Sequence, residues 1–399
     1  MILTDTLFKP RQLPAWWLRF TESNPIVPSA IALTGLVLIC YPLAVIVSAS
    51  EIHGHGQVIE TFRVVSNSKP LVDKAIDLRS AYHQVFSPEV RALFHNLYGN
   101  IALYLVVPFL LLLELLFPVN PAQPLIGKGF LQDSIWYVVA TPLTILILFP
   151  LVGFLSGLFG QYLGFLVITN AKNWPSYIQV TAALLLIEFL VWFTHFARHK
   201  IRTLWYFHAV HHSQKELNIF TEDRGHIVDV LAGTLFTFVP FFVFQVSDPY
   251  TVAIIGIFKP IHNRFIHANL KINLGWLGWL FSSPQFHRVH HSSDPAHRDK
   301  NFGVHFSIYD HIFGTALNNR HVYPETGIED SRLPTEEKVR LSQLPRNWLV
   351  QMAYPFIQVF EQFLAWYRLN FSRMRFRLRR DSNGSVPASI TRKEEPQRL

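Results

Sequence analysis

Histidine is the residue type in this sequence whose number and spacing most suggest chemistry. The chain of 399 residues contains 19 histidines; four precede residue 100, and the other 15 fall between residues 195 and 321. One HxxxH pair and two HxxHH motifs account for eight of them: His195, His199, His208, His211, His212, His287, His290 and His291. Residues three and four apart lie on one face of a helix, so each motif presents its imidazoles on one stripe. Eight neutral nitrogen donors are more than one ion can use, and a centre with two metal ions follows from this count.

The donor chemistry narrows the choice of metal. Imidazole suits Zn, Cu, Fe and Ni, whereas the single cysteine, Cys40, excludes a thiolate cluster and a disulfide scaffold. Three methionines are too few to favour Cu(I), and a closed structural zinc site needs only four ligands. Two irons that activate O₂ beside an apolar substrate fit best, and they would explain a histidine cluster attached to membrane helices.

The elements that must hold these histidines are apolar. The chain is 50% hydrophobic and only 16% charged, with a mean hydropathy of +0.23, whereas soluble domains usually carry about a quarter charged residues. The net charge of +8 favours an anionic partner, and the long apolar blocks favour lipid over nucleic acid. We therefore expect an all-α protein, a polytopic membrane helical bundle with a cytosolic histidine-rich helical cap that holds the two-metal site.

Uncharged stretches of about 20 apolar residues or more predict where the chain meets the membrane. The expected segments are a retained first helix at 23–50, spans at 100–119 and 176–194, one span with a re-entrant or interfacial piece at 134–171, and a short hairpin at 230–258. The hairpin is interrupted at Asp248-Pro249, and the 100–119 span contains Glu114. Residues 51–96 are expected to form an extramembrane loop.

Three regions follow from this pattern. Residues 1–183 hold the N-terminal membrane helices, residues 184–321 a catalytic domain, and residues 322–399 a basic C-terminal segment. Aromatic residues and six arginines between 354 and 380 predict an amphipathic helix, which lies on anionic lipid or packs on the protein's own cytosolic face. The last 19 residues are predicted to be disordered. Together with the basic residues of 198–224, the arginines orient the histidines towards the cytoplasm by the positive-inside rule.

Four segments carry a resemblance to a known family. They are FHAVHHS at 207–213, RGHIVD at 224–229, SPQFHRVHHSSDPAHRDKNFG at 283–303 and YDHIFGT at 309–315. Through them, residues 184–317 resemble the fatty acid hydroxylase / sterol desaturase superfamily, whose members are integral-membrane, histidine-ligated di-iron oxygenases. The sequence departs from the family at two positions: Phe196 stands where an arginine usually follows the first histidine, and Tyr309 replaces a tryptophan.

The resemblance implies metal-ligand roles for the eight histidines above, adds His267, and makes His226 a further candidate. His262 lies five residues before His267 and therefore off its helical face, whereas Asn263 is a candidate weak or water-mediated ligand. The remaining histidines of this region lack ligand spacing and are interpreted as surface or packing residues: His297, His305, His311 and His321.

Carboxylates are the expected partners of ligand imidazoles, which usually donate their second N–H to a carboxylate or carbonyl. Glu188 precedes His195 by seven residues on the same helical face, and a charge within a membrane helix is usually functional. We predict that Glu188 orients a ligand or relays protons; the alternative is a pair with a basic neighbour. Asp229, Asp299 and Asp310 are weaker candidates for the same role, and Asp299 equally suits a turn.

These observations predict an O₂-dependent di-iron enzyme that hydroxylates or desaturates a lipid at an unactivated C–H bond. The candidate substrates are a fatty acyl chain, a sterol-like lipid and a carotenoid. No flavin or haem motif is visible, so electrons are expected from a separate cytochrome b5- or ferredoxin-like protein. Its docking surface would contain Arg198, Lys200, Arg202 and Lys215, which equally suit a lipid-facing patch. The multi-pass protein would reside in a bacterial inner membrane or the endoplasmic reticulum.

Two other functions compete with this prediction. A histidine-rich metal transporter or sensor would spread ionisable residues through the bilayer midplane, but the apolar segments here hold few charges. A non-catalytic family member would not need all three histidine motifs.

Overall fold

The computed structural model describes residues 14–24, 26–36, 101–246 and 249–383. Within these ranges the chain forms helices, three isolated β-bridges and no strand, so the prediction of an all-helical protein is confirmed. The predicted first membrane helix at 23–50 is described only in part, and the predicted loop at 51–96 lies outside the described residues.

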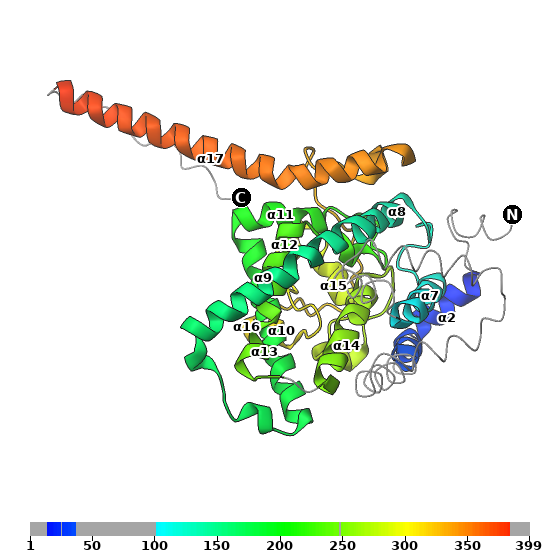
Figure 1. Cartoon of the computed structure of the whole chain (residues 1–399). Helices are drawn as coiled ribbons and strands as arrows, with labels where there is room; N and C mark the ends of the chain where they lie inside the picture. Colours follow the sequence, from blue (N-terminus) through cyan, green and yellow to red (C-terminus); the bar gives the residue numbers. More distant parts are fainter. Residues whose placement is uncertain (1–13, 25, 37–100, 247–248, 384–399) are drawn as a thin grey trace, which may run out of the picture. The chain divides into compact units, whose positions relative to one another are not determined.

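Helices of very different length alternate along the chain (Figure 1). The α-helices are α2 (Ala15–Ser23), α7 (Ile101–Leu116), α8 (Lys128–Ile135), α9 (Thr141–Tyr162), α10 (Ser176–Lys200), α11 (Arg202–His212), α12 (Ile227–Thr237), α13 (Val239–Val243), α14 (Pro249–His267), α15 (Pro284–His290), α16 (Ile308–Phe313) and α17 (Leu344–Asn383). A π-helical turn, η1 (Trp136–Ala140), joins α8 to α9. The 3₁₀ helices are η2 (Gly164–Leu166), η3 (Ala171–Asn173), η4 (Thr221–Asp223), η5 (Gly275–Trp279), η6 (Pro295–His297), η7 (Glu336–Lys338) and η8 (Leu341–Gln343).

Two described helices are long and apolar enough to cross a bilayer. They are the continuous helix Lys128–Tyr162, formed by α8, η1 and α9, and α10. Shorter apolar helices cover Ile26–Leu36, Leu105–Leu116 and Ile227–Val243. The expected span at 100–119 is therefore a shorter helix in the structure, and the 134–171 stretch forms one helix followed by 3₁₀ turns.

The π-helical turn in the first of these helices has a local cause. Pro142 occupies one of the first positions of α9, where it lacks an N–H and its ring clashes with the carbonyl four residues earlier. Widening the preceding turn relieves this clash without ending the helix.

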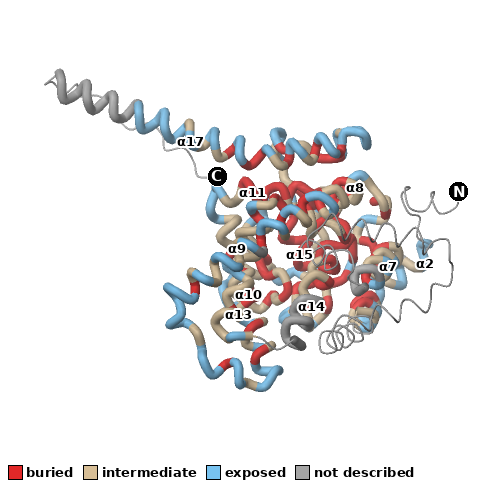
Figure 2. Tube along the Cα trace, viewed as in Figure 1, coloured by how far each residue is buried: buried red, intermediate tan, exposed pale blue. Residues whose placement is uncertain are grey.

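Helix α10 is the centre of the described fold. It packs against α11, α12, α13, α14 and α16, and Figure 1 shows these helices around it. Ala183 and Ile187 are buried on its inner face, whereas its last two turns carry His195 and His199. Buried residues gather around α11 and α15 (Figure 2), so the histidine-bearing helices form the interior of the protein.

The predicted hairpin at 230–258 is longer in the structure. Its first half is formed by α12 and α13, and α14 then continues beyond residue 258 to His267. Polar residues do not end this helix because they are paired inside the protein. Lys259 lies 3.2 Å from a Glu188 oxygen, and Arg264 lies 2.7 Å from an Asp223 oxygen.

The chain divides into two compact units, Met1–Met352 and Ala353–Leu399. The second consists of the greater part of α17, which begins before the predicted 354–380 helix and extends to Asn383. Phe363, Tyr367 and Phe371 stack along this helix. Residues 384–399, most of the predicted disordered tail, lie outside the described residues.

Candidate metal centre

The first of two histidine groups contains five side chains from three helices. His195 and His199 come from α10, His208 and His212 from α11, and His290 from α15; their ligand nitrogens all lie within 4.8 Å of one another. The Nε2 atoms of His195 and His208 are 3.1 Å apart, as are those of His212 and His290. The group is buried apart from His199, which is partly buried.

The second group contains four side chains. His211 comes from α11, His267 from the end of α14, and His287 and His291 from the end of α15. The Nε2 atoms of His267 and His287 lie 2.8 Å apart, and those of His211 and His267 lie 3.2 Å apart. The two groups adjoin, since the rings of His212 and His291 stack with centroids 4.4 Å apart.

Each HxxHH motif divides between the two groups. In α11, His208 and His212 join the first group and His211 the second, whereas in α15, His287 and His291 join the second group and His290 the first. Residues four apart point the same way along a helix, and the residue between them points about 100° away from its neighbour. The expectation of one stripe of three imidazoles is therefore wrong in detail: each motif supplies ligand nitrogens to both groups.

Five rings are held from outside by hydrogen bonds of their Nδ1 atoms. The acceptors are Phe302 O for His195 (2.7 Å), Asp229 Oδ2 for His208 (3.0 Å), Arg224 O for His211 (3.1 Å), Asn263 O for His267 (2.8 Å) and Lys300 O for His290 (2.8 Å). A carbonyl or carboxylate oxygen only accepts, so Nδ1 carries the proton and Nε2 is left with a free lone pair. This assigns the tautomer of each of the five rings.

Converging lone pairs make both groups fit a metal cation. In the first group, His195 and His208 both use their Nδ1 protons outside the group, so their Nε2 atoms meet as two acceptors. His211 and His267 meet in the same way in the second group. A cation between such atoms removes the repulsion. Metal–nitrogen bonds of about 2.1 Å would place neighbouring ligand nitrogens roughly 3.0 to 3.4 Å apart, close to the 3.1 and 3.2 Å observed.

Burial keeps these imidazoles neutral, which is the form that binds metals. It lowers the pKa of His290 to about 4 and lowers the pKa of His212 and His291 well below the ordinary value, with neighbouring histidines adding to the effect. Desolvation favours the uncharged ring in each case.

Asp229 contacts the first group as predicted for a carboxylate partner. Its Oδ2 accepts from His208 Nδ1 at 3.0 Å and from Arg198 Nη1 at 3.2 Å. Both its position at the start of α12 and the positive charge of Arg198 hold the carboxylate against the His208 ring.

Asp310 contacts the loop behind two histidines of the first group and does not contact the histidines themselves. Its carboxylate accepts from the backbone N–H groups of Phe302 at 2.8 Å and Gly303 at 2.6 Å, and from Trp192 Nε1 at 3.2 Å. These bonds fix the loop whose carbonyls at Lys300 and Phe302 hold His290 and His195. Asp310 therefore shapes the ligand-holding loop without touching a ligand.

Glu188 does not contact either histidine group. It pairs with Lys259 Nζ at 3.2 Å and with His305 Nδ1 at 3.0 Å, so the structure shows the alternative, a pair with basic neighbours. His305 is a packing residue, as interpreted from its spacing, but its partnership with Glu188 was missed because the two residues lie 117 positions apart.

His226 and Asn263 are not placed among the ligand nitrogens. His226 Nδ1 caps α12 by accepting from Val228 N, and its Nε2 faces Met352 O at 3.2 Å. Asn263 donates its amide to Glu222 and offers its backbone carbonyl to His267. Asn263 thus positions the predicted ligand His267, and the sequence interpretation of both candidates as ligands has no geometric support.

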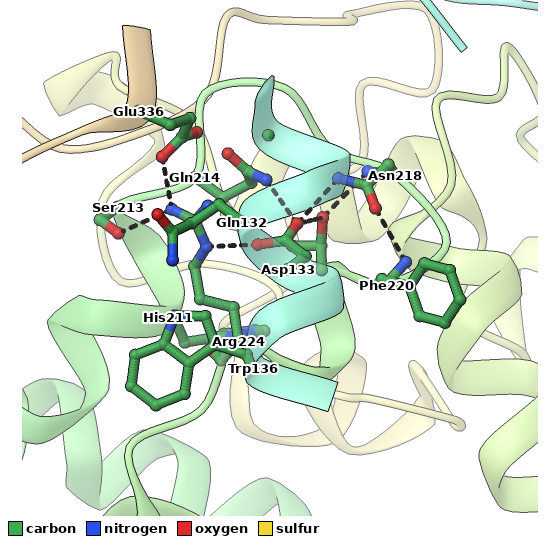
Figure 3. A network of polar contacts seen from close by, with 12 residues as sticks. Gln132, Asp133, Trp136, His211, Ser213, Gln214, Asn218, Phe220, Arg224 and Glu336 are labelled. Atoms are coloured by element: carbon green, nitrogen blue, oxygen red, sulfur yellow. Dashed lines mark hydrogen bonds and ion pairs between the residues drawn. The ribbon is translucent and has the colours of Figure 1, made fainter. Parts of the chain in front are cut away.

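A buried ion network supports the second group and was not foreseen (Figure 3). Arg224 is fully buried; its Nε donates to Asp133 Oδ1 at 2.5 Å and its Nη1 to Glu336 Oε2 at 3.0 Å. Burial lowers the pKa of Arg224, but the two carboxylates raise it above its ordinary value. Asp133 also accepts from Gln214 and Asn218, so the network fixes the segment that carries the Arg224 carbonyl onto His211.

Several predicted surface cations are paired within the protein. Arg198 contacts Asp229, Lys200 lies 2.5 Å from Asp299, and Lys215 lies 3.2 Å from Glu337. Arg202 donates to the Tyr206 hydroxyl. Since Arg224 is also buried, this stretch presents less positive charge than its sequence indicates. Asp299 has a φ of 59°, which agrees with the turn role considered for it.

Of the two departures from the family pattern, Phe196 lies beside the first group and Tyr309 contacts the middle of α10. Phe196 packs on Trp192 and Phe302, with ring centroids 5.5 and 5.4 Å away. The Tyr309 hydroxyl donates to Leu185 O at 2.6 Å. Phe196 therefore packs around the histidines and Tyr309 packs on α10, and neither supplies a donor atom to the two groups.

Nine imidazoles converge in two adjoining groups that are suited to metal binding, within the helical part of the chain that the structure describes. Residues 180–315 match the fatty acid hydroxylase family. This match covers about a third of the chain and confirms, for this segment, the resemblance to the fatty acid hydroxylase / sterol desaturase superfamily that the four sequence motifs indicated.

Curated relatives cover the same part of the chain. An ornithine lipid hydroxylase of Rhizobium tropici is 28% identical over 185 residues, which are 46% of this chain and 52% of that protein. The alkylglycerol monooxygenase of Homo sapiens is 29% identical over 184 residues, 46% of this chain and 40% of that protein. That of Danio rerio is 33% identical over 124 residues, 31% and 27% respectively. The matches thus span about half or less of each relative. No solved structure matches the chain.

Replacing Asp229 with asparagine is expected to weaken metal binding by about 10- to 100-fold, because His208 loses its charged partner. Chelator competition on the purified protein measures this affinity. Glu329→Gln changes an exposed carboxylate and serves as the control. An unchanged affinity in Asp229→Asn would show that the contact does not support the group.

Replacing Arg224 with methionine is expected to destabilise the protein by roughly 3 to 5 kcal/mol, because Asp133 and Glu336 are left buried without a counter-charge. Thermal unfolding in detergent detects the change. In the matched control, Arg332→Met, the lost pair with Asp330 is solvent-exposed, with Arg332 56% accessible, and costs about 1 kcal/mol or less. Equal losses in the two variants would contradict this assignment.

The metal-free protein is expected to lose stability as the pH falls below about 6.5. Below this pH the histidines of the unfolded chain bind protons, whereas the buried histidines of the folded protein stay neutral. For His290, whose folded pKa is about 4, the loss of folding stability continues down to that pH and amounts to about 3 kcal/mol. Unfolding temperatures measured at about pH 7.5, 6.5 and 5.5 test this. Each unit of pKa shift is worth about 1.4 kcal/mol of stability. A constant unfolding temperature would show that the rings protonate freely in the fold.

Proposed function

We propose that this chain is a membrane-embedded, O₂-dependent di-iron oxidoreductase that hydroxylates a lipid. The observation that carries the proposal is the pair of adjoining buried histidine groups, in which the rings held at Nδ1 direct Nε2 lone pairs inwards. The relatives' names add the reaction class: one is a lipid hydroxylase and the other a monooxygenase.

Iron suits these donors and this chemistry. The two groups offer five and four imidazole nitrogens, a ligand type that suits iron, and neither set fills six positions. When bound, two irons would supply the reduction of O₂ and the oxidation of an unactivated C–H bond. The protein's own contribution is to hold the nine rings in place through backbone carbonyls and Asp229, and to keep them neutral by burial.

A lipid substrate agrees with the relatives and with the helices. The named substrates of the relatives are an ornithine lipid and alkylglycerol, and both names favour hydroxylation over desaturation. The apolar helices Lys128–Tyr162 and α10 would bring such a molecule beside the histidines. A fatty acyl chain or the alkyl part of another lipid therefore ranks before a carotenoid.

The multi-pass arrangement, the cytosolic side of the histidines and the electron donor belong to the proposal. With Arg198 and Arg224 paired inside the protein, the orientation rests mainly on the six arginines between 354 and 380. Electrons would come from a separate cytochrome b5- or ferredoxin-like protein. A metal transporter is disfavoured, because the described ligand nitrogens converge on one place instead of following a path.

Reconstitution of the full chain in lipid vesicles with a reductant tests the proposal. We expect about two irons per chain and a lipid product heavier by one oxygen atom, which carries heavy-isotope label when the reaction is run under labelled O₂. Label from water instead of O₂ would contradict an oxygenase.

A ligand variant and its control complete this test. His290→Ala removes a nitrogen from the first group and is expected to lose iron and product, whereas His321→Ala changes an exposed histidine outside both groups and is expected to retain both. Full iron content and activity in His290→Ala would remove His290 from the ligand set.

A further inference from the structure

Five large apolar side chains from η5, the residue after it and α16 are exposed, and we call them the η5–α16 patch. They are Trp276 (81% exposed), Trp279 (52%), Leu280 (37%), Ile312 (64%) and Phe313 (49%). Exposed tryptophans at neighbouring positions are costly in water and mark a surface that meets another apolar phase. The surrounding sequence agrees, because residues 272–286 and 312–319 contain no Asp, Glu, Lys or Arg.

Contacts join the two segments of the patch, although Trp279 and His311 lie 32 positions apart. The Trp279 indole stacks on the His311 ring with centroids 5.3 Å apart. Ser307 donates its backbone N–H to Leu280 O at 3.0 Å and its hydroxyl to Gly278 O at 3.1 Å. These contacts hold η5 against the start of α16.

The patch also continues the surface of α10. Phe313 stacks on Trp192 of α10 with centroids 4.3 Å apart, and the Tyr309 hydroxyl donates to Leu185 O at 2.6 Å. Helix α16 lies beside α10 (Figure 1). On α10 itself, Leu185 and Phe193 are 46% and 48% exposed next to this contact, so the apolar surface runs from the helix onto the patch.

The position along α10 sets the depth of the patch. Leu185 precedes Lys200, the last residue of α10, by 15 residues, which at about 1.5 Å per residue is roughly 22 Å. If the basic end of α10 lies at the membrane surface, the α16 contact lies within a hydrocarbon core of about 30 Å.

We propose that the η5–α16 patch is immersed in the bilayer, with lipid acyl chains as its occupant. The proposal rests on the membrane embedding of α10 in the proposed function and revises the cytosolic cap: part of the histidine-rich region lies in lipid. An electron donor is a poor alternative occupant, because the exposed side chains of the patch are apolar and the neighbouring Arg320 donates its Nη1 to Gly275 O.

The patch is joined to the first histidine group by aromatic contacts. Trp192, which stacks on Phe313, also stacks on Phe196 with centroids 5.5 Å apart. Phe196 meets Phe302 at 5.4 Å, and the Phe302 ring lies 5.1 Å from that of His199. A lipid that approaches the metals from the bilayer would therefore meet the first group from the side of this patch.

Site-directed spin labels on the full chain in lipid nanodiscs test the proposal. Cysteine is placed at Trp276 or Ile312 after the single native cysteine is replaced by Cys40→Ser. Phe154 of α9, 64% exposed, is the lipid-facing control, and the exposed Glu329 is the water-facing control. The readout is whether each label collides more often with lipid-soluble O₂ or with a water-soluble nickel complex.

The expected result is that labels at 276 and 312 favour O₂, as at 154, whereas the label at 329 favours the nickel complex. Labels at 276 and 312 that behave like 329 would overturn the patch while membrane embedding stands. A water-accessible label at 154 would overturn the embedding itself and the patch with it. Labels at 276 and 312 shielded from both reagents would show a protein occupant, such as a second copy, and would also overturn the proposal. Each labelled variant must retain the iron content of the unlabelled protein, which confirms that it is folded.

Discussion

The outward hydrogen bonds of the histidine Nδ1 atoms are the interaction on which this structure depends. A backbone carbonyl or a carboxylate behind each of five rings fixes the proton on Nδ1 and turns the Nε2 lone pair inwards. Two such rings face each other within each group. Without a cation this arrangement is repulsive, so the folding free energy of the surrounding helices must hold it together until metal binds.

The surrounding structure supplies that support in different ways for the two groups. The first group depends on a loop fixed by Asp310 and on Asp229, which is itself held by Arg198. The second depends on Arg224, whose guanidinium is enclosed by Asp133 and Glu336. Buried charges of this kind are costly to desolvate, and here they fix the backbone at a position where a ligand needs an acceptor.

The histidine motifs predict much of the site because helix periodicity is local. The spacings in 195–199, 208–212 and 287–291 are enough to identify eight of the nine gathered histidines, and family resemblance supplies His267. Apolar composition likewise predicts an all-helical chain. Spacing could not predict the partners of Glu188, because Lys259 and His305 come from distant segments; the structure shows the alternative, a pair with basic neighbours.

The sequence by itself determined which helices present imidazoles and that the protein is helical and apolar, since both depend on residues within a few turns of one another. Only the tertiary structure decided how each HxxHH motif divides between two groups and which oxygen stands behind each ring. It also decided that Arg224 is an interior charge and that Trp279 stacks on His311. These properties depend on which segments pack against each other. Contacts between residues more than 100 positions apart, such as Arg224 with Glu336 and Glu188 with His305, cannot be predicted from local spacing.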